Sequence, residues 1–308
     1  MTGAAGFIGS NLAERLATAG WRVRGLDVVS PYYDVAQKRH NLTDLATQRS
    51  FEFVEGDLLD VDLEALLEDV DVVFHQAGQP GIRKSWDDFD AYLVSNVAAT
   101  RRLLDAAVST QIGRLVYASS SSVYGDADVY PTSETATPRP HSPYGVTKLA
   151  GEHLVGAYAR NWGLSTIALR YFTVYGPRQR PDMAMHRIIE ACLNGTSFPL
   201  FGDGSQIRDF TYVDDVVEAN VAAATSEVEP GTVVNVAGGD STTLANVIAI
   251  VERLLGCEVE LDRRSVQAGD VHRTGGATEL ARTLLGWSPS VTVEEGLGRQ
   301  VKWHTARR

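Results

Sequence analysis

The chain begins Met1-Thr2-Gly3-Ala4-Ala5-Gly6-Phe7-Ile8-Gly9 and continues as an amphipathic helical pattern. Glycines at positions 3, 6 and 9 allow a tight turn and a close approach of the backbone to a pyrophosphate. The free N–H groups and the dipole of the following helix favour an anion at the same place. The sequence therefore predicts a dinucleotide-binding loop. Its expected cofactor-binding residues are Gly3, Gly6, Phe7, Ile8 and Gly9.

A strand expected over residues 21–26 follows this helix and ends at Asp27. A carboxylate at that strand end can accept from both hydroxyls of an adenosine ribose and repels a 2′-phosphate, which predicts NAD rather than NADP. A turn or capping role is the alternative for this residue. Only Met1 and Thr2 precede the glycine loop, although a dinucleotide-binding fold needs a buried strand there. Either the first strand is very short or the true start lies upstream.

Strands and helices then alternate, as a doubly wound parallel (Rossmann) α/β sheet requires. We expect strands over residues 51–54, 70–75, 114–118 and 164–170, and long helices over residues 89–108 and 144–161. Ligands of open parallel sheets gather at the carboxyl ends of the strands. Further cofactor-binding candidates on these elements are Asp57, Leu58, Gln76, Ala77, Gly78, Asn96 and Tyr171.

The pattern changes after Gly176-Pro177, where short helices and strands mix with loops. We expect residues 1–175 to form an NAD-binding Rossmann domain, to which the chain returns at about residues 206–236. Residues 176–308 are expected to form a smaller mixed α/β domain that lies over the carboxyl ends of the first domain and binds the substrate.

A serine cluster, Ser119 to Ser122, follows the expected strand at 114–118, and Tyr144 and Lys148 come further along the chain. A Tyr and a Lys four residues apart share one face of a helix. A phenol with a pKa near ~10 is a poor base at neutral pH, and an adjacent ammonium favours its ionised form. The pattern predicts a Ser-Tyr-Lys proton-transfer site. An ordinary surface pair is the alternative on spacing alone.

Composition excludes several classes of function. The formal net charge is −11, which argues against a surface for nucleic acid or anionic membranes. The two cysteines, Cys192 and Cys257, are far apart, and the seven histidines form no HxxH, HxxxH or HExxH pattern, so we expect neither a disulfide framework nor a metal site. No signal peptide and no long apolar run occurs, which predicts a cytoplasmic protein.

The glycine loop, Asp27, Asp57, the serine cluster and Tyr144-x-x-x-Lys148 together resemble the extended short-chain dehydrogenases that act on nucleotide sugars, the NAD-dependent epimerase/dehydratase family. The match spans nearly the whole chain. Within this family the sequence is most similar to the UDP-glucuronate 4-epimerases. Four stretches carry that similarity: residues 32–42, 78–83, 170–184 and 267–274.

The resemblance implies roles for individual residues. Ser120 falls at the position of the family's catalytic Ser or Thr, with Tyr144 as the base and Lys148 bridging the cofactor ribose and the phenol. Ser121 and Ser122 replace the Asp and Glu with which the family's 4,6-dehydratases eliminate water, so a dehydratase is not expected. The substrate-binding residues implied are Ser120, Ser121, Ser122 and Thr173 for the sugar, Arg180 for its carboxylate end, and Arg208 and Asp270 for the diphosphate and the uridine ribose. Arg83 is a further substrate-binding candidate, with solvated surface charge as the alternative.

The implied activity is the interconversion of UDP-glucuronate and UDP-galacturonate through a 4-keto sugar, with bound NAD. A UDP-glucuronate decarboxylase and a UDP-glucose 4-epimerase are the alternatives, and an NAD-binding regulator without activity is a third. The family also implies a homodimer, formed by the helices that begin near Phe89 and Tyr144.

Overall fold

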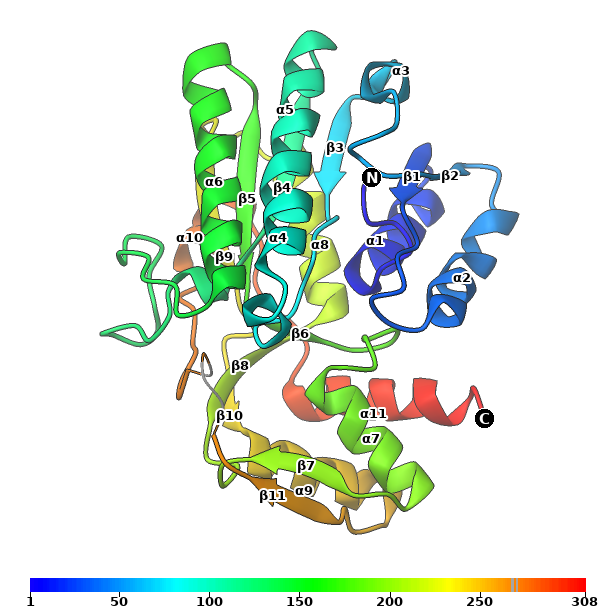
Figure 1. Cartoon of the computed structure of the whole chain (residues 1–308), viewed down its shortest axis with the longest axis vertical. Coiled ribbons are helices and arrows are strands. Elements are labelled where there is room, and N and C mark those ends of the chain that lie inside the picture. Colours follow the sequence, from blue (N-terminus) through cyan, green and yellow to red (C-terminus); the bar gives the residue numbers. More distant parts are fainter. Residues whose placement is uncertain (267–268, 270) are drawn as a thin grey trace.

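A parallel sheet forms the core of the upper half of the molecule in Figure 1, which shows a computed structural model describing residues 1–266, 269 and 271–308. Strands β3, β4, β5 and β9 lie side by side in that order, and β1 pairs with β2. All these pairs are parallel, as predicted. The strands are β1 (Val23–Asp27), β2 (Phe51–Glu55), β3 (Val72–His75), β4 (Arg114–Ser120), β5 (Thr166–Tyr171) and β9 (Thr232–Val236).

Helices cover both faces of this sheet. Consecutive residues of a strand point to opposite faces, so Leu115 and Tyr117 of β4 pack in one buried cluster while Val116 and Ala118 pack in another. One face is covered by α1 (Phe7–Thr18) and α8 (Val213–Thr225), and the other by α3 (Leu63–Leu67), α5 (Ala99–Ser109) and α6 (Pro143–Trp162). The predicted doubly wound α/β fold is confirmed.

Thr2 lies between β1 and β3 and connects the two groups of strands. This single residue bridges to Leu26 of β1 and to His75 of β3. Its N–H donates to the Phe74 carbonyl at 3.0 Å, and its hydroxyl lies 2.7 Å from the His75 Nδ1. Burial lowers the pKa of His75 to about 3, so this imidazole is a neutral part of the junction between the two groups of strands.

The lower half of the molecule contains two small sheets and the helices that pack on them (Figure 1). One sheet orders β10 (Ser241–Thr243), β8 (Ile207–Tyr212) and β6 (Thr173–Tyr175), and the other pairs β11 (Leu261–Arg264) with β7 (Phe198–Phe201). The helices are α7 (Ala184–Asn194), α9 (Leu244–Leu255) and α11 (Val293–Thr305), while α2 (Val35–Thr43) and α10 (Glu279–Leu285) pack in the upper half.

The long helix predicted over residues 89–108 is interrupted. It begins as α4 (Phe89–Leu93), passes through a π-helical turn (Val94–Ala98) and continues as α5. Such turns occur often at functional sites, and this one carries Ser95 to the candidate site described below. By contrast, α6 is one unbroken helix. The Ser142 hydroxyl caps it by accepting from the Gly145 N–H at 3.1 Å.

The two cysteines are paired, so the prediction of no disulfide is wrong. Cys192 of α7 and Cys257, just beyond α9, form a disulfide with their Cα atoms 6.2 Å apart. The two residues are 65 positions apart in sequence, and only the packing of α7 against α9 brings them together. Within the described ranges of the chain, no helix has the length and apolar character needed to cross a bilayer.

Candidate active site

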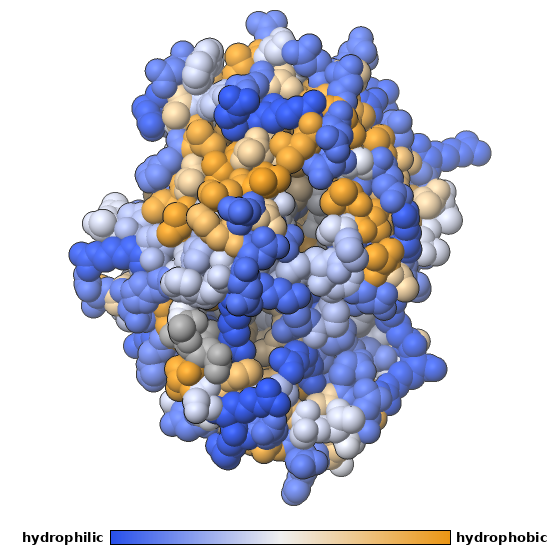
Figure 2. Space-filling view, in the orientation of Figure 1, coloured by the Kyte–Doolittle hydropathy of each residue, from blue (hydrophilic) through white to orange (hydrophobic). Residues whose placement is uncertain are grey.

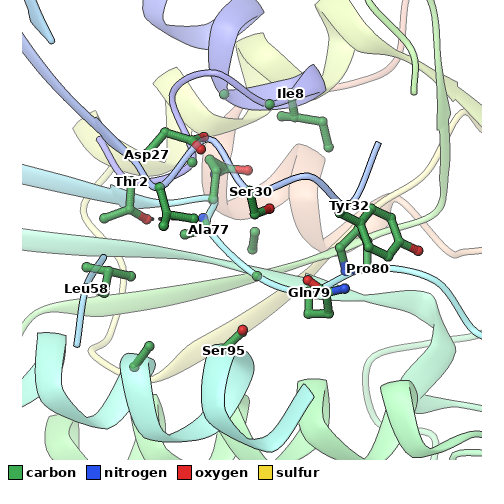
Figure 3. Close-up of a pocket in the computed structure, with 18 of the residues that line it drawn as sticks. Thr2, Ile8, Asp27, Ser30, Tyr32, Leu58, Ala77, Gln79, Pro80 and Ser95 are labelled. Carbon is green, nitrogen blue, oxygen red and sulfur yellow. Dashed lines mark hydrogen bonds between the residues drawn. The ribbon is translucent and has the colours of Figure 1, made fainter. Parts of the chain in front are cut away.

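A cleft of about 370 Å³ runs along the carboxyl ends of the upper strands (Figure 3). Figure 3 shows Asp27 and Tyr32 toward its opposite ends, with Ser95 reaching in from the helix beneath. All but one of the predicted cofactor-binding residues line this cleft. They are Gly3, Gly6, Phe7, Ile8, Gly9, Asp27, Asp57, Leu58, Gln76, Ala77, Gly78, Tyr144, Lys148 and Tyr171.

The exception is Asn96, which the structure places behind the wall of the cleft. Its side-chain amide accepts from the Gln79 N–H at 2.6 Å and donates to the Gln79 carbonyl and to the Thr147 hydroxyl, both at 3.0 Å. These bonds occupy the amide, and the residue is only 1% exposed. Asn96 thus holds Gln79, which lines the cleft, and its predicted contact with the cofactor stays a prediction.

The glycine loop fits a dinucleotide for two reasons that the structure makes visible. Gly3 has a φ of +71°, which disfavours residues with a Cβ, and a Cβ at Gly9 would lie 2.0 Å from the Gly3 carbonyl oxygen. Gly6 begins α1 without a side-chain capping bond. The first N–H groups of the helix therefore face the cleft without a side chain across them, as an anion site at a helix N-terminus requires.

Asp27 both fixes this loop and lines the cleft. Its carboxylate accepts from the Ala5 N–H at 3.0 Å and from the Val29 N–H at 2.7 Å, through different oxygens. Each oxygen keeps further lone pairs for the hydroxyls of a ribose. The predicted ribose role and the alternative turn role are thus compatible in one side chain.

Lys38 lies beside Asp27 and was not among the predicted site residues. It is 6% exposed, lines the cleft, and donates to the Ser30 hydroxyl at 3.2 Å. Burial lowers the pKa of this ammonium, and the Asp27 carboxylate opposes that shift. Ser30, Tyr32 and Tyr33 also line the cleft from the segment after β1. The spacing of these residues in the sequence does not indicate that they line the cleft, because they lie on an irregular loop.

Tyr144 lines the cleft, and the Ser120 hydroxyl is close enough to its phenol to lower the pKa of that phenol. The same hydroxyl accepts from the Ser122 N–H at 3.2 Å and lies 2.9 Å from the Ser122 hydroxyl. Burial raises the pKa of Tyr144, while the Ser120 hydroxyl and the charge of Arg180 act in the opposite direction.

Lys148 contacts the end of β4. Its ammonium donates to the Ala118 carbonyl at 2.6 Å and lies 5.1 Å from the centre of the Tyr117 ring. Burial lowers its pKa to about 8. The Ser120 hydroxyl and the Arg180 charge lower the pKa of the Tyr144 phenol, and the predicted bridge from Lys148 to the cofactor ribose and the phenol stays a prediction.

Arg180 reaches the cleft from the segment before α7. Its Nε and Nη2 atoms bind the Asp182 carboxylate at 3.0 and 2.9 Å. Because this pair uses one edge of the guanidinium, the Nη1 hydrogens remain as donors. The side chain is 18% exposed, so a cation lies close to Tyr144 in a largely buried setting.

A glycine cradle, a carboxylate at the end of β1, Tyr144 and Lys148 thus line one cleft. The NAD-dependent epimerase/dehydratase family matches residues 1–237. The chain belongs to this family.

Individual relatives in the epimerase/dehydratase family narrow the activity. UDP-glucuronic acid 4-epimerase from Bacillus cereus, solved with UDP-glucuronic acid and NAD, superposes with a TM-score of 0.96 at 39% identity, over 100% of this chain and 98% of that one. A probable UDP-glucuronate 4-epimerase of Rhizobium meliloti is 35% identical over 99% of this chain and 96% of its own length. An uncharacterized UDP-glucose epimerase of Bacillus subtilis, YtcB, is 40% identical over 98% and 96%. The chain is an NAD-dependent nucleotide-sugar 4-epimerase.

The substrate-binding residues predicted for this epimerase are less well gathered than the cofactor-binding ones. Among those that the structure describes, Arg180 alone lines the cleft of Figure 3. Ser122 is held against Ser120, and Ser121 begins the turn that follows β4. Thr173 opens β6, two residues beyond the partner of Ser120 in β5.

The more distant substrate candidates of the epimerase have other contacts. The Arg83 guanidinium stacks on the Phe201 ring at 3.9 Å. Arg208 donates to the carbonyls of Ile207, Val271 and His272. Asp270 lies outside the described residues. Binding of the substrate by Arg83, Arg208 and Asp270 therefore stays a prediction.

Proposed function

We propose that this epimerase interconverts UDP-glucuronate and UDP-galacturonate by inverting C4. The observation that carries the proposal is Arg180, a largely buried cation beside Tyr144 in a chain of strongly negative net charge. A buried charge needs a partner, and Asp182 engages only one edge of this guanidinium. A sugar carboxylate is a suitable second partner, because Arg binds carboxylates through several N–H donors.

Tyr144 is the general base of the proposed reaction. Its phenolate, beside the Ser120 hydroxyl, takes the proton of the C4 hydroxyl to become the phenol and later returns that proton. Bound NAD supplies a reversible hydride acceptor for C4. The 4-keto sugar then turns about its diphosphate link, so that the second hydride transfer reaches the other face.

A uronic acid adds a requirement that a neutral hexose does not have. With a ketone at C4, the substrate is a β-keto acid, which loses carbon dioxide when the breaking C5–C6 bond overlaps with the carbonyl. An epimerase must therefore hold the carboxylate where this overlap is poor. Ser121, Ser122 and Thr173 are the proposed hydroxyl donors, and Arg180 is the proposed cation.

UDP-glucose 4-epimerisation is the second candidate, and the relative of Bacillus subtilis supports it. A neutral hexose has no use for Arg180 as a carboxylate partner. A UDP-glucuronate decarboxylase would use the same oxidation without restraining the carboxylate. One experiment separates the three: incubation with UDP-glucuronate and with UDP-glucose, followed by NMR of the C4 configuration and of any pentose. UDP-galacturonate without pentose is expected, and turnover of UDP-glucose alone would contradict the proposal.

The proposal includes a homodimer. Figure 2 shows hydrophobic side chains gathered on the upper half of the molecule, over the region where Figure 1 has α4, α5 and α6. Large apolar side chains that are exposed on these elements are Phe89, Leu93, Val94, Val146 and Trp162. Exposed apolar surface of this kind marks an interaction site, and two copies of the same helices can cover it around a twofold axis.

A further inference from the structure

Two imidazoles meet between α7 and α11, away from the cleft. The ring centres of His186 and His304 are 4.6 Å apart and the rings are nearly perpendicular. They border a separate cavity of about 470 Å³, which is also lined by His40, Glu190 and Trp303. His40 is exposed, so the cavity reaches the surface.

Hydrogen bonds fix the tautomer of both rings. The His186 Nδ1 lies 2.9 Å from the Gln179 carbonyl, which can only accept, so this nitrogen carries the proton. The His304 Nδ1 lies 2.6 Å from a Glu190 carboxylate oxygen and carries its proton for the same reason. Both Nε2 atoms therefore keep a lone pair. Metal-binding histidines are held in this way, with the other ring nitrogen donating to a carbonyl or a carboxylate.

If His304 served only to pack α11 against α7, the environment of its Nε2 atom would be unexplained. The residue is 4% exposed, and this nitrogen has no hydrogen-bond partner in the described part of the chain.

We propose that His186 and His304 bind one divalent transition-metal ion of the zinc class through their Nε2 atoms. One ligand atom each from His186, Glu190 and His304 lie within 4.8 Å of one another. Bonds of about 2.0–2.1 Å to nitrogen separate two ligands of one ion by at most about 4.2 Å, so on binding the two rings would turn to bring both Nε2 atoms to the ion. Glu190 serves as the carboxylate that orients His304, and imidazole ligands favour zinc, copper or nickel over magnesium or calcium.

The proposed metal site lies outside the active site but is connected to it through the segment that contains Gln179 and Arg180. Gln179, whose carbonyl holds His186, precedes Arg180, and its side-chain oxygen accepts from the His186 N–H and from Gln300 of α11, both at 2.9 Å. A bound ion would tie α11 to the segment that presents Arg180. The inference does not depend on which sugar the epimerase uses.

The test uses the full chain without an affinity tag, stripped of metal with a chelator and titrated with Zn²⁺ in a calorimeter. Binding of one ion per chain is expected, and it should be lost in His186→Ala and in His304→Ala. His153→Ala removes an exposed imidazole of α6 and should bind as the unaltered protein does. Glu190→Ala should weaken binding by about 10–100-fold, as loss of an orienting carboxylate does.

A second measurement covers variants that fail to fold. Cu²⁺ bound to the unaltered protein is examined by pulsed electron paramagnetic resonance, which counts the imidazoles on the ion. Two imidazoles support the proposal. One or none, no saturable Zn²⁺ binding, or unchanged binding in both folded histidine variants overturns it. Because no sugar is present, these outcomes are independent of the proposed activity.

Discussion

Arg170 and Glu152 form a two-point ion pair beneath the serine cluster, with N–O distances of 2.5 and 3.0 Å and 5% exposure of each side chain. The same carboxylate accepts from the Ser119 hydroxyl at 2.8 Å. The pair thus connects β5, α6 and the end of β4, the three elements that present Tyr171, Tyr144 and Ser120.

Breaking this pair should destabilise the fold strongly. Glu152→Ala leaves the Arg170 guanidinium buried without its partner, and we expect the free energy of unfolding to fall by about 3–5 kcal/mol. Urea denaturation measures it. The matched control is Glu218→Ala, which breaks an ion pair with Arg15 whose side chains are 46% and 43% exposed; it should change the value by about 1 kcal/mol or less. An equal fall in the free energy of unfolding in both variants would show that the buried Arg170–Glu152 pair contributes no more to stability than an exposed pair.

Tyr144→Phe should reduce C4 inversion by about 10²–10⁴, the usual effect of losing a general base. The change removes one oxygen and keeps the ring, so binding of NAD and of UDP-sugar should persist in calorimetry. Ser120→Ala should have a smaller effect, because the substrate hydroxyl still reaches the phenol. A Tyr144→Phe protein with normal turnover would remove Tyr144 from its proposed role.

The pH dependence of the reaction should report the environment of Tyr144. The deprotonated phenol is the base and burial raises its pKa, so kcat/KM should rise as pH increases above neutral. The Arg180 charge lowers that pKa, and Arg180→Met should therefore move the rise to higher pH. Arg187→Met, which removes a nearby cation of α7 that does not line the cleft, should leave the profile unchanged.

Changing Ser121 and Ser122 together to Ala should alter the product rather than the oxidation. The carboxylate would lose two hydroxyl donors while Tyr144 and Ser120 remain, so carbon dioxide and a 4-keto pentose should increase relative to UDP-galacturonate. NMR and carbon dioxide release measure the ratio. Normal epimerisation of UDP-glucuronate by the double variant would contradict the restraint assigned to these serines.

The homodimer should depend on the apolar surface of α4–α6. Light scattering at micromolar concentration should give twice the chain mass, and Leu93→Lys should shift it toward the monomer. Leu93 is 38% exposed; Leu254 on α9 is 39% exposed and supplies the control, Leu254→Lys. A monomer mass for the unaltered protein would exclude the dimer.

The sequence predicted those features that follow from local pattern. Glycine spacing, strand-end polar residues and the helix that carries Tyr144 and Lys148 are each encoded within a few tens of residues, and they gather in the cleft as expected. Contacts that depend on tertiary packing were missed. The direction of Lys148 depends on the Ala118 carbonyl. The Cys192–Cys257 disulfide and the His186–His304 contact both join segments that only the packing of α7 brings together. An arginine near the end of a strand, in the β5 sequence Thr-Ile-Ala-Leu-Arg-Tyr, was the one available signal of the Arg170–Glu152 pair.

The division of the parallel strands into β1–β2 and β3–β4–β5–β9, bridged by Thr2, has a consequence for the dynamics of the sheet. Because β1 does not pair directly with β3 in the described chain, β1 and β2 should behave as a cooperative unit of lower stability than β4 and β5. Their amides should exchange with deuterium sooner. Asp27 belongs to the less stable unit and Tyr144 to the more stable one. A dinucleotide that contacts both would link them thermodynamically, so saturation with NAD should slow exchange most in β1 and β2, the strands furthest from the chemistry.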